Sequence, residues 1–288
     1  MSIWISDIEA MMTGTFPRIA HVAPECYGMV GNPETFIREL KKRGHRADLL
    51  VFGQRLPDVE PHHSYVMAWE DVAALRVTSY EHWLGKQIIK ENRKNIAKAE
   101  KRGVKVAEAD YSDEFVAGIV RIYNESPVRQ GKAFWHYQKD FEVVKKENGT
   151  YLDRSIFIGA YWENALIGFV KLVLTDRCAS TLQVISMIEH RDKKPTNALL
   201  AKAVEICAAK NIPFLQYGVW SEGTLGDFKR YNGFQKIRMP KYYVPMTMMG
   251  RLALKLKLHR GIRHRLPGRL LSGARAIRKR IHEYQHGK

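Results

Sequence analysis

A charged loop and the helical segment after it carry the clearest chemical signal in this sequence. The loop, 189–195, reads EHRDKKP and supplies three cations: Arg191, Lys193 and Lys194. Thr196 follows, and its hydroxyl can accept an N–H group of a first helical turn that also holds Asn197. Because unpaired N–H groups and the helix dipole attract anions, the pattern predicts a phosphate or pyrophosphate site, for example for coenzyme A. The alternative is an ordinary loop with solvated charges.

A second group of candidate residues lies in the segment 126–141, SPVRQGKAFWHYQKDF. It brings aromatic side chains together with hydrogen-bonding ones, which is typical of a loop that lines a pocket. The candidates are Arg129, Gln130, Trp135 and His136. The alternative is a connection between helices whose aromatic side chains fill the core. His136 could act as a base, although a histidine beside aromatic residues is more often a core residue.

Alternating β-rich and helical patterns between 155 and 245 must position these residues. Val, Ile, Phe and Tyr crowd three runs, which predict strands at 156–162, 166–174 and 181–188. A helix at 196–210 follows, with one apolar face, and then a strand at 213–220, a short helix at 228–232 and a strand at 234–245. Upstream, the pattern predicts a strand–helix–strand unit at 18–52, a long basic helix at 83–102 and a helix at 112–123.

This order of elements, ending in FKRYNGF (228–234), resembles the second half of the GNAT acyltransferase fold. RKNIAKAEKRGVKV (93–106) and FKRYNGFQKIRMPKYYVPMT (228–247) are similar to segments of the FemABX-related branch, and the likeness spans about Trp83–Thr247. The resemblance implies an α/β fold with a GNAT-like mixed central sheet flanked by helices. It also implies acyl transfer onto an amine, from acyl-CoA in most GNAT enzymes and from aminoacyl-tRNA in the Fem peptidoglycan enzymes.

The resemblance also implies roles for individual residues. Aligned on Gly233 and Phe234, the position where many GNAT enzymes carry a general-acid tyrosine is Lys229, which is similar to the FemABX branch. Lys229 would stabilise an oxyanion or a leaving group, and Tyr231 is a second candidate acid. Glu189 and His190 follow the strand that faces the acyl donor in that fold, so either could deprotonate the amine, directly or through water. At the end of the next strand, three further residues would line the same cleft: Tyr217, Trp220 and Glu222.

The sequence departs from the GNAT pattern at the phosphate loop. Acetyl-CoA enzymes of this superfamily usually carry R/Q-x-x-G-x-G/A, whereas the loop here reads RDKKPTNA and has no glycine. Pro195 also removes one N–H donor. Side-chain cations would therefore have to compensate for missing backbone contacts.

Composition separates a basic C-terminal segment from the rest of the 288-residue chain. The net charge is +17; Arg251–Lys288 holds 12 Lys/Arg and one acid, so this segment alone carries +11. We expect an accessory α/β lobe at 1–82, the acyltransferase domain at 83–247 and a basic amphipathic tail at 248–288. The tail suits an anionic membrane surface or RNA phosphates, or it is a solvated helix.

Other features of the composition bear on location and cofactors. No run of about 20 apolar residues predicts a membrane-spanning helix, and the N-terminus lacks the basic start of a signal peptide. Three widely spaced cysteines argue for a reducing compartment and against a zinc site, and no metal-binding pattern is visible. We expect a cytoplasmic protein, either free in the cytoplasm or peripheral at the inner face of the membrane.

Three functions follow from these observations. The first is an N-acyltransferase that moves an acyl group from acyl-CoA, with acetyl-CoA as first choice, to an amine such as an amino sugar or a cell-envelope intermediate. The second is a Fem-like transferase that uses aminoacyl-tRNA, which the net charge and the basic helix at 83–102 favour. The third is a non-catalytic protein that binds an anionic glycan intermediate. The acceptor, the acyl group and the oligomeric state stay open.

Overall fold

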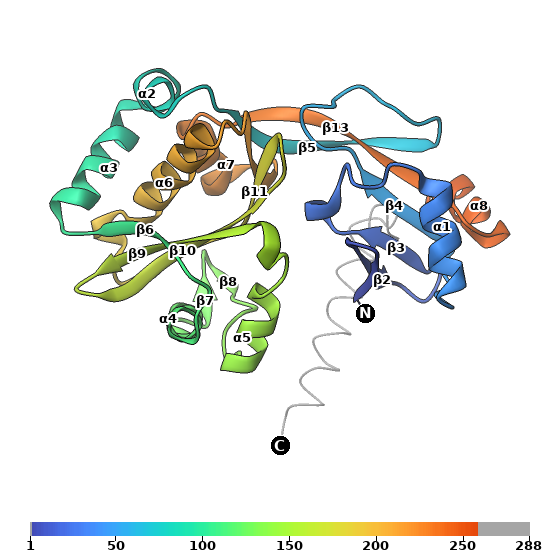
Figure 1. Cartoon of the computed structure of the whole chain (residues 1–288), viewed down its shortest axis with the longest axis horizontal. Coiled ribbons are helices and arrows are strands. Elements are labelled where there is room, and N and C mark those ends of the chain that lie inside the picture. The colour runs from blue at the N-terminus through green and yellow to red at the C-terminus, as the bar shows by residue number, and fades with distance from the viewer. Residues whose placement is uncertain (1, 259–288) are drawn as a thin grey trace, which may run out of the picture. The chain divides into compact units, whose positions relative to one another are not determined.

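The computed structural model describes residues 2–258, which form two compact units (Figure 1). Unit 1 takes residues 2–53, 62–68 and 241–258, and unit 2 takes 54–61 and 69–240. Two strands, β5 (Val66–Arg76) and β13 (Gln235–Pro245), contribute residues to both units. The three-part division at 82 and 247 stays a prediction, and the predicted tail from 259 on lies outside the described residues.

Unit 2 contains a mixed sheet in the order β13-β5-β12-β11-β10-β9-β6. Its remaining strands are β6 (Lys105–Ala109), β9 (Ser155–Trp162), β10 (Ala165–Leu174), β11 (Cys178–Ser186) and β12 (Phe214–Val219). Strands β6, β9, β10 and β11 are joined antiparallel, β11 and β12 parallel, and β12 and β5 antiparallel. The predicted α/β fold with a mixed central sheet is confirmed.

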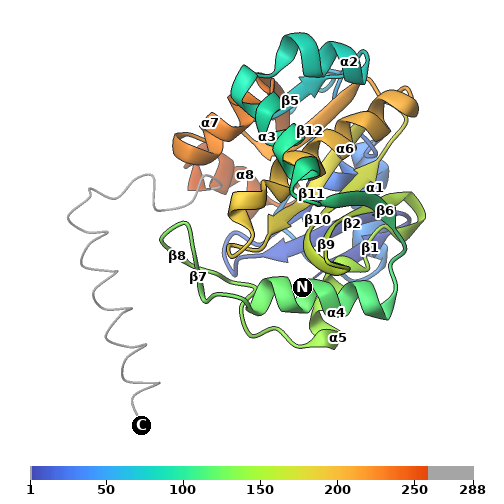
Figure 2. The ribbon, with the colours of Figure 1, turned by 90° about the vertical axis from the view of Figure 1, so that its left-hand side faces the viewer.

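Helices cover both faces of this sheet (Figure 2). One face carries α3 (Lys90–Lys101) and α6 (Pro195–Ala209), and the other carries α4 (Asp113–Asn124) and α5 (Phe141–Asn148). Side chains alternate along β10, so that Val170 packs toward α6 and Phe169 toward α4. A further helix, α7 (Gly223–Tyr231), follows β12.

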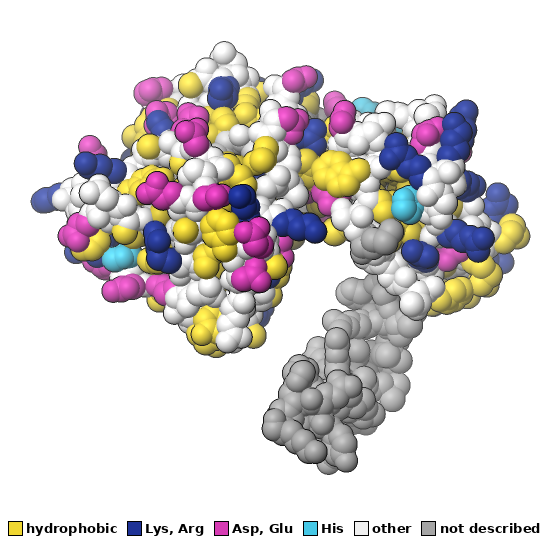
Figure 3. All heavy atoms as spheres, turned by 60° about the horizontal axis from the view of Figure 1, so that its bottom comes forward, with side chains coloured by type: hydrophobic (Ala, Val, Ile, Leu, Met, Phe, Trp, Pro, Cys, Tyr) yellow, Lys and Arg dark blue, Asp and Glu magenta, His cyan; other side chains and the backbone are white. Residues whose placement is uncertain are grey.

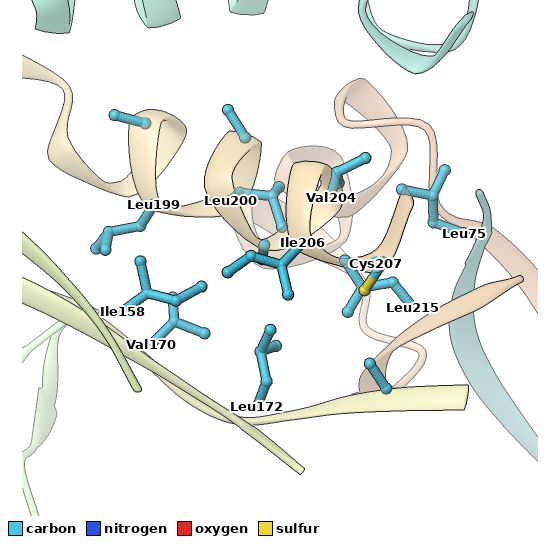
Figure 4. Packing of buried hydrophobic residues seen from close by; sticks show 14 of the residues in the cluster. Leu75, Ile158, Val170, Leu172, Leu199, Leu200, Val204, Ile206, Cys207 and Leu215 are labelled. Carbon is cyan, nitrogen blue, oxygen red and sulfur yellow. The ribbon is translucent and has the colours of Figure 1, made fainter. Parts of the chain in front are cut away.

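The core beneath α6 shows why this helix holds its place (Figure 4). Leu199 and Ile206 are buried and point toward the sheet, where Val170 and Leu172 of β10 are buried as well. Burying each such side chain stabilises the fold by roughly 1.5–3 kcal/mol. The apolar face predicted for this helix is therefore confirmed, and it fixes the position of the helix N-terminus beside β11.

The predicted long helix at 83–102 is wrong in its first half. Tyr80–His82 form a short helix, α2, and Trp83–Gln87 form a π-helical turn; Ile88 is then extended before α3 begins. The buried Trp83 donates its Nε1–H to the carbonyl of Asn232 at 2.9 Å, and Arg93 donates to the carbonyl of Ile88 at 2.8 Å. The tertiary bond to Asn232 and the local bond to Ile88 favour the break over a continuous helix.

Unit 1 begins with two strands that the sequence patterns did not reveal, β1 (Ser2–Ile5) and β2 (Ile8–Thr13). They are followed by β3 (Ile19–Val22), the 3₁₀ turn η1 (Pro24–Cys26), α1 (Pro33–Lys42) and β4 (Leu49–Gly53). Asn32 caps α1, because its Oδ1 accepts the N–H of Thr35 at 3.1 Å. Near the end of the described residues, Met248–Lys255 form helix α8.

The two units contain the same order of strands and helices. The series β1-β2-β3-η1-α1-β4 of unit 1 has the same order as β9-β10-β11-η4-α6-β12 of unit 2, where η4 is the 3₁₀ turn Arg191–Lys193. Each helix starts with a proline, Pro33 or Pro195. In each series the last strand pairs in parallel with the third over three residue pairs. Within residues 2–258, no helix is long and apolar enough to cross a membrane.

Candidate functional site

The candidate site lies where β11 and β12 diverge. The two strands pair only over Cys178–Ser180 and Phe214–Gln216. The register of β11 against β10 then shifts, and so does that of β12 against β5, where Tyr217 and Gly218 form a bulge. Gly218 has a φ of 57°, a conformation that favours glycine. These irregularities let the strands separate and leave room for a ligand between them.

A cavity of about 650 Å³ occupies this position. One part of its lining comes from the end of β11, Val184–Ser186, and another from α7, at Thr224, Leu225 and Phe228. Eight of the residues predicted from the sequence also line it: Arg129, Gln130, Trp135, Arg191, Lys194, Thr196, Asn197 and Tyr217. The predicted donor-binding and acceptor-binding groups therefore meet in one cavity.

The predicted N-cap of α6 is wrong. Lys194, with a φ of 60°, occupies the cap position, and Thr196 lies in the first turn. The Oγ1 of Thr196 is 2.7 Å from the Oγ of Ser186, so the hydroxyl joins the helix start to the end of β11. Sequence patterns could not reveal this, because the partner of the hydroxyl lies on another element.

The loop before α6 offers few free N–H groups. Most already donate to backbone carbonyls nearby: those of Arg191, Lys193, Lys194, Asn197 and Ala198. Pro195 has none. Two loop cations line the cavity, Arg191 and Lys194, and neither belongs to an ion pair within the described part of the chain. Anion binding here would depend mainly on these side chains.

Three predicted residues of the same loop do not line the cavity. The Nζ of Lys193 lies 3.2 Å from the Nδ1 of His190 and 4.3 Å from the centroid of the Trp162 ring. The His190 ring also contacts Trp162, with centroids 5.3 Å apart. Glu189 is exposed. The cavity lining contains no carboxylate or imidazole among the described residues, so the two candidate bases stay predictions without direct access to it.

An ion pair that the sequence patterns did not reveal holds the end of β11. The carboxylate of Glu125 accepts the N–H of Ile188 at 2.8 Å and that of Glu189 at 2.9 Å, and it pairs with Arg129 at 2.8 Å. Arg129 also donates to the carbonyls of Ser186, at 2.7 Å, and Ile122, at 2.8 Å. We call Glu125 and Arg129 the strand clamp. The spacing of four residues was visible in the sequence, but the backbone groups that they bind were not.

Lys229 is buried, with 3% of its surface exposed, and does not line the cavity. Its Nζ donates to the carbonyl of Val219 at 2.6 Å and to the Oγ of Ser221 at 3.1 Å. The same Nζ lies 5.0 Å from the centroid of the Tyr217 ring, which does line the cavity. Burial lowers the pKa of Lys229 and raises the pKa of Tyr217 to about 12. Tyr217 therefore keeps its proton at neutral pH and can donate it in a hydrogen bond.

His136 is buried beside the cavity rather than in its lining. Its ring stacks on Tyr123 at 4.2 Å, and its Nε2 lies 3.4 Å from the amide nitrogen of Gln183. Burial, followed by the charges of Lys139 and Arg129, lowers the pKa of His136 to about 4. The carboxylate of Glu147, 3.9 Å from Nδ1, does not offset the burial. The structure thus places His136 as a neutral core residue.

The remaining predicted residues differ in position. Trp135 lines the cavity and is 69% exposed, with the Nζ of Lys139 3.7 Å from its ring centroid. Tyr231 is 45% exposed and lies outside the lining, as does Trp220, whose Nε1–H donates to Glu222 at 3.2 Å. Within residues 2–258, no cluster of three or more His, Cys, Asp or Glu side chains could hold a metal ion.

Comparisons with solved structures agree with this architecture. Similar structures include FemX (TM-score 0.58, 9% identity, covering 81% of this chain and 83% of that one). Another is the C-terminal domain assigned to a lysylphosphatidylglycerol synthetase of Agrobacterium fabrum (TM-score 0.55, 11% identity, covering 89% of this chain and 88% of that one). L-PGS of Bacillus licheniformis is also similar (TM-score 0.52, 12% identity, covering 84% of this chain and 83% of that one). No family model matches the chain, and no curated protein matches it by sequence.

These similarities define the class of fold. The mixed sheet, the parallel pair that diverges and the helix between its strands give the chain a GNAT-like fold. The predicted likeness to the FemABX-related branch is confirmed, because the chain shares its fold with FemX and with the lysylphosphatidylglycerol synthetase domain.

Proposed function

We propose that the chain transfers an acyl group from an activated donor to an amine, in the cavity between β11 and β12. One observation carries this proposal: the predicted donor-side residues Arg191 and Lys194 line the same 650 Å³ cavity as the predicted acceptor-side residues Arg129 and Trp135. A ternary complex, in which the amine attacks the donor carbonyl directly, needs both partners in one such space.

In this mechanism the nitrogen of the acceptor bonds to the donor carbonyl carbon, and the bond from that carbon to the donor oxygen or sulfur then breaks. The ammonium loses its proton to water, because the described lining holds no base of its own. Tyr217 donates a hydrogen bond to the oxyanion of the tetrahedral intermediate, and Lys229 lies behind its ring as a positive charge. The nitrogen that has attacked loses a second proton, which passes through water to the leaving oxygen or sulfur.

We favour aminoacyl-tRNA as the donor over acyl-CoA. A pyrophosphate held by backbone groups needs free N–H donors, and most of those in 191–198 are already bonded within the loop. The fold neighbour FemX points the same way, because the resemblance to the Fem enzymes implies aminoacyl-tRNA as the donor. The net charge of +17 suits a polyanionic donor.

Acyl-CoA, with acetyl-CoA as its simplest form, is the second candidate. Arg191 and Lys194 line the cavity at the start of α6, and side-chain cations can hold a pyrophosphate without the backbone. A cleft between diverging parallel strands also suits the narrow arm of coenzyme A. Under either proposal the acceptor is an amine, for instance on an amino sugar or a cell-envelope intermediate.

Thermal unfolding of the full chain would separate the donors. We would compare acetyl-CoA, free coenzyme A, bulk aminoacylated tRNA and the same tRNA after deacylation. A ligand at about 100 times its Kd adds about 2.7 kcal/mol to the free energy of unfolding. We expect the aminoacylated tRNA to stabilise the chain in a salt-sensitive way, and an Arg191→Ala, Lys194→Ala variant to lose that response. A shift with acetyl-CoA alone would favour the second candidate, and no shift with any probe would contradict both.

A further inference from the structure

We propose that α8 and the basic hollow beside it form a docking surface for an anionic lipid bilayer. All of the residues that carry this inference belong to unit 1, and it does not depend on the transfer reaction.

Helix α8 packs through its small residues. Gly250 and Ala253 are buried, and a Cβ at Gly250 would lie 1.9 Å from the carbonyl oxygen of Asp48. Thr247 fixes the helix start, because its Oγ1 accepts the N–H of Gly250 at 3.1 Å and donates to the Oδ1 of Asp48 at 2.7 Å. The orientation of the helix is therefore set by a close backbone approach that admits no larger side chain.

This orientation turns the large apolar side chains outward. Four of them are well exposed: Met248 at 73%, Met249 at 43%, Leu252 at 44% and Leu256 at 44%. A surface helix ordinarily buries its apolar stripe against the core, so the arrangement here is inverted. A cluster of exposed apolar side chains on a short segment is typical of an interaction surface.

Cations surround these apolar side chains. Arg251, Lys255 and Lys257 are exposed within the same segment. A hollow of about 580 Å³ is lined by Met246 and Thr247, directly before α8, together with His45 and three Lys/Arg residues: Arg18, Lys41 and Arg46. Hydrophobic and Lys/Arg side chains adjoin on the part of unit 1 that carries α8 (Figure 3).

The acidic residue that lines this hollow, Asp48, is already engaged. Its Oδ2 accepts the N–H of Arg18 at 2.9 Å, and its Oδ1 accepts the hydroxyl of Thr247. Asp48 contributes one negative charge and three Lys/Arg side chains line the hollow, so a net positive charge is left for an external anion, which lipid phosphates would supply.

Apolar and cationic groups together favour a bilayer over other partners. Methionine and leucine side chains gain free energy by entering the acyl region, while each nearby Lys or Arg is attracted to anionic headgroups. RNA would bind the cations but would gain little from the apolar side chains. The sequence beyond the described residues, 259–288, adds nine Lys/Arg and one acid, so its charge suits the same surface.

Co-sedimentation of the full chain with vesicles tests this proposal. The vesicles would contain phosphatidylcholine alone or phosphatidylcholine mixed with phosphatidylserine. We expect binding to the mixed vesicles, and we expect Met248→Ser with Leu252→Ser to weaken it about tenfold or more. The matched control is Val66→Ser with Leu152→Ser, which removes two apolar side chains of similar exposure elsewhere and should leave binding unchanged.

A second variant tests the hollow. Lys41→Glu with Arg46→Glu should weaken binding to the mixed vesicles while the melting temperature stays near that of the wild type, because both side chains are exposed. Wild-type binding to neither vesicle, or equal binding by the Met248→Ser, Leu252→Ser variant, would overturn the proposal. A change from dimer to monomer in the Met248→Ser, Leu252→Ser variant would also overturn it, because α8 would then be the contact surface for a second copy. If the same variant lost binding to a structured RNA to the same extent as binding to vesicles, the partner of α8 would be RNA. Vesicle binding is read without turnover, so its failure is distinguishable from failure of the transfer proposal.

Discussion

The Nζ of Lys229 lies 5.0 Å from the centroid of the Tyr217 ring. The buried Lys229 thus contacts an aromatic side chain that lines the cavity, and its Nζ donates a hydrogen bond of 2.6 Å to the carbonyl of Val219. This relationship separates two roles that the sequence patterns could not distinguish: direct contact with the reacting atoms, and support of the residue that makes it.

Tyr217→Phe removes the hydroxyl and keeps the ring. If Tyr217 donates a hydrogen bond to the oxyanion, turnover should fall about 10²- to 10³-fold while donor binding changes little. Single-turnover transfer and a binding titration with the same donor would measure the two effects. Tyr161→Phe, on β9 and outside the cavity lining, is the matched control. Turnover that equals that of the wild type would remove Tyr217 from the mechanism.

Lys229→Met removes the charge and keeps most of the side-chain volume. The carbonyl of Val219 and the hydroxyl of Ser221 would each lose a buried donor, so the free energy of unfolding should fall by about 1–3 kcal/mol. Turnover should fall as well, whereas a non-catalytic binding protein would keep its ligand. Urea unfolding and transfer assays would be run beside Lys236→Met, an exposed lysine of the same unit. Unchanged stability would contradict the buried contacts.

The strand clamp should act as a unit. Glu125→Gln and Arg129→Ala each break the ion pair and release backbone groups at the end of β11. We therefore expect the double variant to be less destabilised than the sum of the single variants, with a coupling of about 0.5–3 kcal/mol. Denaturant unfolding of the four proteins gives the coupling directly. Because the clamp positions one side of the cavity, donor affinity should fall in each variant that breaks it. If the losses in the free energy of unfolding were additive, the two side chains would act separately.

His136 should make stability depend on pH. Its folded-state pKa of about 4 lies below the ordinary 6.5, so the unfolded chain takes up a proton first as the pH falls. The stability that neutral His136 contributes is complete above pH 6.5 and is lost as the pH drops toward 4. His136→Phe should flatten this part of the profile, measured by urea unfolding at stepped pH, while exposed His82→Phe should not. Identical slopes for wild type and His136→Phe would contradict the assignment.

Much of unit 2 was predictable because its elements have strong local patterns. The runs that predicted strands at 156–162 and 166–174 match β9 and β10 closely, since β-branched and aromatic residues fill buried positions there. Ser112 has a side chain typical of an N-cap, and its Oγ accepts the N–H of Phe115. Local chemistry decides such features, so the sequence alone is sufficient.

Features that depend on distant contacts were not predictable. Helix periodicity continues through Trp83, yet the indole bond to Asn232, 149 residues away, favours a π turn. Leucines recur at every second position from 252 to 258, a period typical of a strand, but α8 forms because Gly250 fits against Asp48. In the candidate site, the charged residues near 190 were found by composition, whereas only the fold shows that Lys193 faces Trp162 and Arg191 lines the cavity.

The order of strands and helices that the two units share has a consequence for the number of donor molecules that one chain binds. In unit 2 the parallel strands diverge and a cavity opens, but in unit 1 the N–H of Gly28 donates to the carbonyl of Gly53 at 3.1 Å, and the Tyr27 ring covers Gly53 so closely that a Cβ there would lie 2.5 Å from it. The position equivalent to the cavity is therefore filled by the chain itself. Although the topology occurs twice, a calorimetric titration should saturate at one donor molecule per chain.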